Sequence, residues 1–167
     1  GRGLRRWWAG DPVGDDVGVD VPAFHHEVRR TVGGDLLTLA YHPIAVTGFP
    51  TGYVDPAVTA DAEVRVDRVV QLRDDGTVVH DHDLSLVLDV RRIGFMSLDE
   101  VDGAYDWSHS NSLTEHVVDD GLVVSVRHQD AVIELDRRTG ALRWILANPD
   151  NWSPELDALR LAPIGAP

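Results

Sequence analysis

Three residues in the segment 106–144 have side chains suited to binding an anion: His109, Asn111 and Arg127. His109 and Asn111 are two positions apart, so on a β-strand they would lie on the same face. Arg127 ends the next expected strand, and a hairpin turning near 119–120 would place it roughly opposite residue 112. Two neutral donors beside a permanent cation suit a phosphate, sulfate or carboxylate. The alternative is structural: His109 and Asn111 cap a strand end, and Arg127 pairs with a surface carboxylate.

Two adjacent histidines, His25 and His26, begin an earlier expected strand. Successive residues of a strand point to opposite faces, so only one of the two can face a shared site. The pair holds the same place in its strand set that His109 holds in the later one. If the two sets are neighbouring blades of a propeller, their first strands line the central axis, and the two positions would converge there.

The remaining histidines carry weaker signals. His80 and His82 would share one face of a strand, and an H-x-H pair can bind zinc. No third ligand is evident, so we interpret both as solvated edge residues, with His116 and His128 similar, and we predict no metal site. The sequence also lacks the G-x-S-x-G motif and the Walker and Rossmann glycine patterns.

Composition excludes several classes of partner and chemistry. The 167 residues carry a formal net charge of −13, which argues against nonspecific binding to nucleic acid or anionic membranes. The absence of cysteine excludes disulfides, thiolate catalysis and iron–sulfur clusters. No apolar run approaches the roughly 20 residues that span a bilayer. The opening GRGLRRWWAG lacks the apolar core of a signal peptide and has no initiator methionine, so we expect the chain to begin inside a longer protein.

Short segments bounded by Gly, Asp and Asn dominate the chain and predict strands. We expect them near 3–8, 23–30, 35–41, 64–72, 77–82, 109–117, 121–127, 131–136 and 141–146. Only 153–161 has helical features, with Ser153 as N-cap and Pro154 in the first turn. The pattern G-x-x-x-W occurs at 3–7 and 140–144, and residues 76–80 follow the same frame with histidine at the aromatic position. Each occurrence would end a set of strands.

This repetition predicts an all-β chain, namely a β-propeller fragment of about two four-stranded antiparallel blades plus one strand. Residues 1–10 would be the last strand of a preceding blade, and 22–82 the first full blade, with an insertion at 42–62. Residues 83–107 would be a connector, 108–146 the second full blade and 147–167 the start of the next connector. Trp7 and Trp144, with Ile145 and Leu146, would anchor packing between blades. Because so few strands cannot close a ring, the rest of the propeller would be needed to complete the site. A self-contained sandwich is the alternative.

Three stretches together resemble a known family. D-W-S-H-S-N-S-L at 106–113, S-V-R-H-Q at 125–129 and I-E-L-D-R-R-T-G-A-L-R-W-I-L at 133–146 are similar to bacterial arylsulfotransferases that use no nucleotide sulfate donor. F-H-H-E at 24–27, followed by G-G-D-L-L, is similar to an earlier strand and hairpin of that family.

The resemblance implies a six-bladed propeller with an axial active site and no cofactor. Its reaction would move a sulfuryl group from a phenolic sulfate ester to a phenol acceptor, in ping-pong fashion through a sulfated histidine. By this resemblance His109, Asn111 and Arg127 bind and polarise the sulfuryl oxygens, and His26 does so from the preceding blade. A periplasmic or extracellular location is compatible with it.

One part of the family pattern is missing. The family's nucleophilic histidine follows a glutamine soon after a W-x-L-G segment, whereas this chain has Ala147 after W-I-L and ends at Pro167. His128 precedes Gln129 rather than following it. We therefore assign no nucleophile, expect it beyond Pro167, and expect the chain alone to be inactive. Two alternatives stay open: a noncatalytic propeller that serves as a binding module, and a quinone-dependent dehydrogenase, whose blades share D-x-x-T-G-x-x-x-W.

Overall fold

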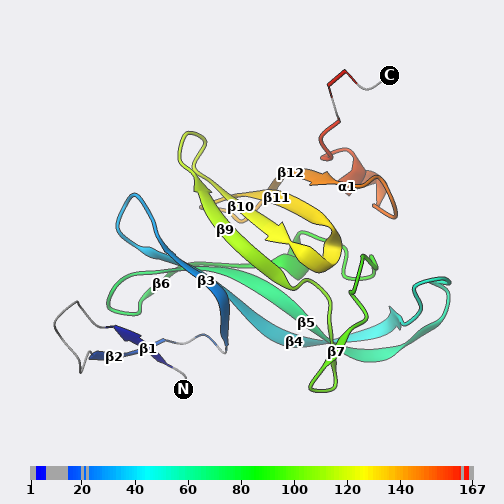
Figure 1. Ribbon diagram of the computed structural model, residues 1–167, viewed down its shortest axis with the longest axis horizontal. Coiled ribbons are helices and arrows are strands. Elements are labelled where there is room, and N and C mark those ends of the chain that lie inside the picture. Colours follow the sequence, from blue (N-terminus) through cyan, green and yellow to red (C-terminus); the bar gives the residue numbers. More distant parts are fainter. Residues whose placement is uncertain (1–2, 7–14, 20, 22, 163, 166–167) are drawn as a thin grey trace.

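The regular structure of the described residues is almost entirely β-strand (Figure 1). The computed structural model describes residues 3–6, 15–19, 21, 23–162 and 164–165. The strands are β1 (Gly3–Arg6), β2 (Asp15–Gly18), β3 (Phe24–Arg30), β4 (Leu36–Pro50), β5 (Thr59–Leu72), β6 (Val78–Asp83), β7 (Glu100–Val101), β8 (Ala104–Asp106), β9 (Ser110–His116), β10 (Gly121–Val126), β11 (Ala131–Asp136) and β12 (Leu142–Ala147). Two 3-10 turns, η1 (Leu84–Leu86) and η2 (Arg127–Gln129), and a short helix, α1 (Pro154–Asp157), complete the described elements. The predicted all-β class is confirmed.

The first large sheet contains an antiparallel meander in the order β3-β4-β5-β6. The pairing of β4 with β5 runs from Leu36 opposite Leu72 to Pro50 opposite Thr59. Most of the segment 42–62, where we expected an insertion, therefore continues these two strands beyond the meander. The outer edge of β5 is shared, since β6 pairs with residues 68–72 and β8 pairs in parallel with residues 64–65.

The second large sheet is a four-stranded antiparallel meander in the order β9-β10-β11-β12. Its hairpins turn where the sequence places Asp and Gly. Gly140, before β12, has a φ of 73°, a region that glycine enters without steric cost. A Cβ at this position would also lie 2.5 Å from the Nδ1 of His82, so the turn packs closely against β6 of the first sheet.

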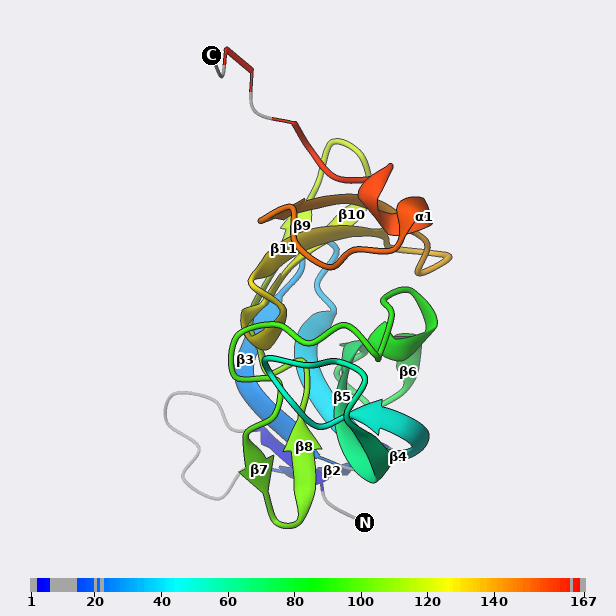
Figure 2. The same cartoon turned by 90° about the vertical axis from the view of Figure 1, so that its right-hand side faces the viewer.

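A single large apolar core joins the two sheets. It includes Leu37 and Val66 from the first sheet, Leu113 and Ile133 from the second, and Trp107 between them. Trp107 is fully buried, and its indole Nε1 donates to the carbonyl of Arg92 at 2.8 Å. Figures 1 and 2 show the β9–β12 sheet on one side of the β3–β6 meander, with α1 beside β12. Between β6 and β9 the chain forms η1 and then β7 and β8, which still pair with the first sheet, before it enters the second sheet.

Several finer expectations change at the edges of the fold. The strand at residues 3–6 pairs with β2, which the sequence did not predict. Trp7 lies outside the described residues. The helix covers only 154–157, although Ser153 does cap it. Leu146 is 54% exposed and so is not buried between the sheets, whereas Ile145 is fully buried as expected.

None of the helices that the structure describes is long and apolar enough to cross a bilayer.

Candidate functional site

Two of the predicted anion-binding histidines meet where the sheets approach each other. The Nε2 of His26, on β3, lies 3.1 Å from the Nε2 of His109, immediately before β9. The two rings are 5.0 Å apart in an edge-to-face arrangement. The sequence left open whether His25 or His26 faces the site; His26 is the one that reaches His109.

Local backbone irregularities aim both side chains at this point. His26 and His109 have φ values of 55° and 41°, which are uncommon for residues other than glycine. The β3–β4 register shifts between His25 and Val28, so His26 lies in a bulge. His109 is not inside a regular strand as we expected but precedes one. Bulges bend a strand and redirect a side chain, and backbone strain of this kind is often concentrated at functional sites.

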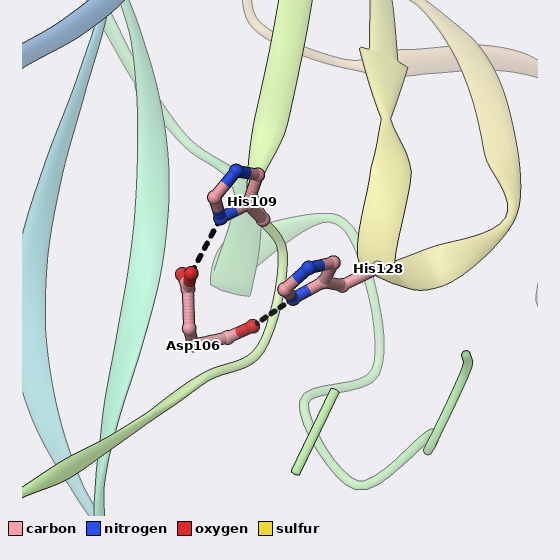
Figure 3. A group of neighbouring side chains, drawn as sticks. All are labelled: Asp106, His109 and His128. Carbon is pink, nitrogen blue, oxygen red and sulfur yellow. Dashed lines mark hydrogen bonds and ion pairs between the residues drawn. The ribbon is translucent and has the colours of Figure 1, made fainter. Parts of the chain in front are cut away.

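Asp106 holds two imidazoles at once (Figure 3). Its Oδ2 lies 2.5 Å from the Nδ1 of His109, and its main-chain carbonyl lies 2.5 Å from the Nδ1 of His128. The rings of His109 and His128 stack with centroids 4.5 Å apart and an interplanar angle of 19°. His128 is only 2% exposed, and its Nε2 has no hydrogen-bond partner among the residues that the structure describes. Our expectation that His128 is a solvated edge residue was therefore wrong, because η2 turns it inward.

A second carboxylate supports the site from β5. The Nε2 of His25 lies 3.1 Å from the Oδ1 of Asp67, and the His25 ring packs edge-on against His26 at 5.1 Å. Asp67 is buried; its Oδ2 accepts from the backbone N–H of Ser110, and its own N–H donates to Ser108 Oγ at 2.9 Å. Asp67 thus ties β5 to the start of β9 on either side of His109. Sequence reasoning missed both Asp67 and Asp106.

The other two predicted residues, Asn111 and Arg127, share a hollow of their own. Arg127 begins η2 and is exposed, with its Nη2 3.6 Å from Met96 Sδ. Arg127 and Asn111 both line a hollow of about 310 Å³, whose other lining residues are Ser125, Asp130, Ala131, Val132 and Leu146. The predicted register was wrong: Ser125 is opposite Ser112, and a bulge then pairs Val126 with Ser110.

The structure therefore brings the four predicted residues together as two pairs. His26 contacts His109, and Asn111 shares a hollow with Arg127. The pairs are linked through the chain, since His128 follows Arg127 and stacks on His109. Asp130 adds a carboxylate to the hollow, but its Oδ2 accepts the backbone N–H of Phe95 at 3.0 Å.

The surroundings of His26 lower the pKa of its imidazole. Desolvation lowers its pKa below the usual value, as do the neighbouring imidazoles of His25 and His109, and the charges of Asp67 and Asp106 oppose this only partly. At neutral pH His26 is thus mainly a neutral imidazole, with one N–H donor and one acceptor.

Two groups of side chains bring possible metal ligands within 4.8 Å of one another: Asp106, His109 and His128, and His116, Asp119 and Glu134. In the first group, the rings of His109 and His128 are nearly parallel. Each nitrogen lone pair lies in the plane of its ring, so the two lone pairs do not converge on one point as the ligands of a tetrahedral metal site do. In the second, the Glu134 carboxylate already accepts from Arg143 and Trp144. We assign a metal to neither.

His80 and His82 serve the contact between the sheets. Their rings stack at 5.7 Å, so they do share a face of β6. His82 Nε2 lies 2.7 Å from the carbonyl of Arg137, in the turn that leads to β12. Both side chains are half-buried, so they are not the solvated edge residues we expected.

This geometry belongs to a chain whose sequence matches the family model "Arylsulfotransferase (ASST)" over residues 14–166. The chain belongs to the arylsulfotransferase family. At the level of the family, membership implies a sulfotransferase-type function with an aryl sulfate donor and a phenol acceptor. No curated protein matches the chain significantly. All four residues predicted to bind the sulfuryl group lie within the matched segment.

Proposed function

We propose that this chain provides part of a sulfuryl-binding site, in an enzyme that transfers a sulfuryl group from a phenolic sulfate ester to a phenol and needs the rest of the propeller to complete the site. His26, His109, Asn111 and Arg127 bind the sulfuryl oxygens. The observation that carries the proposal is the 3.1 Å approach of His26 to His109 across two sheets, in a chain that matches the family over residues 14–166. Within the described part of the chain the two Nε2 atoms contact each other, and the Asp106 carboxylate contacts Nδ1 of His109 rather than its Nε2, so neither Nε2 is held in a structural ion pair.

The chemistry fits these residue types. Sulfuryl transfer resembles phosphoryl transfer, in which charge spreads over the non-bridging oxygens in a loose transition state, so positioned donors contribute more than covalent force. The imidazole N–H groups and the Asn111 amide supply directional donors, and the planar guanidinium of Arg127 can bind two oxygens at once. We propose a ping-pong reaction through a sulfated histidine, since a covalent intermediate divides a difficult transfer into two easier steps. The nucleophile is none of these four residues.

The architecture is part of the same proposal. We infer that the meanders β3–β6 and β9–β12 are successive blades of a six-bladed propeller, divided as 22–82 and 108–146 with the connector 83–107 between them. Residues 1–10 and 147–167 would then belong to the preceding strand and the next connector. The support is that each meander is four-stranded and antiparallel, and that the two facing histidines lie at equivalent places, His26 on the first strand of one meander and His109 immediately before the first strand of the other.

A binding experiment with matched ligands tests the proposal. Isothermal titration calorimetry (ITC) would compare 4-nitrophenyl sulfate with 4-nitrophenol, which lacks only the sulfuryl group. We expect the ester to bind more tightly, and we expect His109→Gln to remove that difference while His80→Gln preserves it. Equal binding of the two ligands would contradict the proposal.

Turnover and its intermediate form the second arm of the test. Release of 4-nitrophenol in the presence of phenol would measure transfer, and mass spectrometry of the protein would map any sulfated residue. A sulfo group on His26 or His109 would make that residue the nucleophile and contradict the binding role.

A further inference from the structure

The proton positions in the His26–His109 contact follow from Asp106. A carboxylate at neutral pH has no proton to donate, so the 2.5 Å contact between Asp106 Oδ2 and His109 Nδ1 requires the proton to be on Nδ1. A neutral His109 then has a bare lone pair at Nε2. By fixing the proton on Nδ1, Asp106 determines that Nε2, the nitrogen of a neutral His109 that faces His26, carries no proton.

Only one proton fits between the two facing nitrogens. At 3.1 Å, His26 Nε2 and His109 Nε2 are at hydrogen-bond distance, and one must donate while the other accepts. Either a neutral His26 donates from Nε2, or a charged His109 donates to His26. Both arrangements place one proton between the two nitrogens, but the first has two neutral rings, whereas the second has a charged His109 and already holds one ring proton more.

An anionic sulfuryl group changes this requirement. Its oxygens are acceptors only, so both Nε2 atoms must carry a proton to bind it. His26 can do so as a neutral ring. His109 must become an imidazolium, with one proton toward Asp106 and the other toward the anion. Relative to a free site in which both rings are neutral, the pair then holds one more proton.

We propose that Asp106 is a positioning residue for His109, that both rings are neutral in the free site, and that binding of a sulfuryl oxyanion at His26 and His109 takes up one proton from solution. This inference rests on the proposed function, because it concerns the same anion site. The proton comes from solvent or buffer, and it is released again when the anion leaves.

The charged groups around the pair are consistent with this uptake. The lowered pKa of His26 favours a neutral His26 ring in the free site at neutral pH. Asp67, from β5, is already engaged by His25, and Asp106 is the carboxylate in contact with His109. His128, from η2, fixes the main chain of Asp106 and stacks on His109 without donating to it.

Calorimetry in two buffers tests the proton count directly. Inorganic sulfate would be titrated into the chain in phosphate-free buffers of low and high ionisation enthalpy at the same neutral pH. The difference between the observed enthalpies gives the number of protons exchanged per sulfate. We expect an uptake close to one, and sulfate affinity that declines as pH rises.

Nitrogen-15 NMR of the histidine rings tests the same assignment without a ligand. We expect His109 in the free protein to carry its proton on Nδ1, and to carry protons on both nitrogens once sulfate is added. The opposite tautomer in the free protein would overturn the role of Asp106. Neither readout requires transfer activity or a folded variant.

Asp106→Asn removes the charge while keeping the shape of the side chain. We expect sulfate to bind about tenfold more weakly at neutral pH, as expected for the loss of a charge-assisted hydrogen bond, and its affinity to decline at lower pH than in the wild type. A merely structural role would weaken binding without moving the pH profile. The matched control is Asp119→Asn, because Asp119 also faces a histidine three residues away, His116, at 3.6 Å. Asp119→Asn should leave both the sulfate affinity and its pH dependence unchanged.

The outcomes separate this inference from the proposed function. Sulfate binding without proton uptake would overturn the inference and leave the anion site standing. Failure of sulfate to bind at all would overturn both. Uptake of one proton that persists in Asp106→Asn with an unchanged pH profile would overturn the role of Asp106 alone.

Discussion

His26 and His109 are 83 positions apart in the chain, yet their Nε2 atoms lie 3.1 Å from each other. Each is the residue at which its strand departs from regular geometry, with a positive φ in both cases. Backbone strain of this kind costs about 1–3 kcal/mol per residue, so the surrounding structure must enforce it. The fold of the junction between the two sheets therefore imposes the contact between His26 and His109.

Replacing His26 with glycine should separate stability from binding. Glycine adopts the φ of 55° at residue 26 without strain, so we expect the free energy of unfolding to rise by about 1 kcal/mol. Inorganic sulfate should bind more weakly, because one of the two facing imidazoles is lost. Urea denaturation and calorimetric titration measure the two effects on the same sample.

Asn151→Gly is the control for this variant, since Asn151 also has a positive φ, 61°, but lies in the turn before α1. It should raise stability by a similar amount and leave sulfate binding unchanged. Unaltered sulfate affinity in His26→Gly would show that His26 does not contribute to the anion site.

Arg127→Lys should impair anion binding without destabilising the fold. Arg127 is exposed, and the contact of its guanidinium is with Met96 Sδ at 3.6 Å, so little packing is lost. Lysine keeps the charge but loses the planar fork that binds two oxygens. We expect 4-nitrophenyl sulfate to bind about tenfold more weakly, measured by calorimetry, with an unchanged denaturation midpoint.

Arg138→Lys, at an exposed position in another turn, provides the comparison. Equal loss of affinity in both variants would indicate a nonspecific charge effect rather than an oxyanion contact at Arg127.

The strands of both meanders could be predicted from the sequence because their turns are chemically explicit. Asp119-Asp120-Gly121 and Thr139-Gly140 mark hairpins where a positive φ is needed, and Asp120 and Gly140 do have one. What failed was the register near the site. A bulge adds a residue to one strand only, and alternation of side chains does not encode where that happens.

The supporting residues of the site were missed for a related reason. His128 was interpreted as a solvated edge residue, but the chain leaves β10 after Val126 and η2 buries the imidazole. Asp106 stands three residues before His109, a spacing that could have suggested the pair. Asp67 had no local signal at all, because it is brought to the site only by pairing between distant strands.

Acid should destabilise the second meander through Glu134. Burial raises the pKa of this carboxyl, but hydrogen bonds from Arg143, His116 and Trp144 outweigh it and hold the pKa below the usual 4.5. A lowered pKa in the folded state contributes stability that is complete above about pH 4.5 and is lost as the pH falls through the folded value. Denaturant titrations at a series of pH values should show this decline.

Glu134→Gln should remove part of that acid dependence. The Glu134 side chain is 2% exposed, and Arg143 Nη1 lies 2.9 Å from its Oε1. We therefore expect the free energy of unfolding to fall by about 3 kcal/mol at neutral pH and to depend less steeply on pH in acid. Glu155→Gln, at an exposed position in α1, should change neither. If the free energy of unfolding of Glu134→Gln falls with acid as steeply as that of the wild type, other carboxylates cause the loss of stability.

Gly94→Ala should disturb the site from the connector. A Cβ on Gly94 would meet the carbonyl oxygen of His128 and lie 2.9 Å from the Cα of Gln129, both of them backbone atoms of η2. Backbone cannot yield as a flexible side chain can, so we expect a loss of about 2 kcal/mol in unfolding free energy. Because η2 also carries Arg127, sulfate binding should weaken as well.

Gly33→Ala is the matched control for that substitution. The nearest atom to a Cβ on Gly33 is Thr31 Oγ1 at 3.7 Å, an ordinary van der Waals distance, and Gly33 lies in the β3–β4 turn away from η2. We expect little change in either stability or sulfate affinity. If Gly94→Ala loses stability but binds sulfate as tightly as Gly33→Ala, the position of η2 does not govern the anion site. That result would remove Arg127 and His128 from the residues whose placement matters for binding.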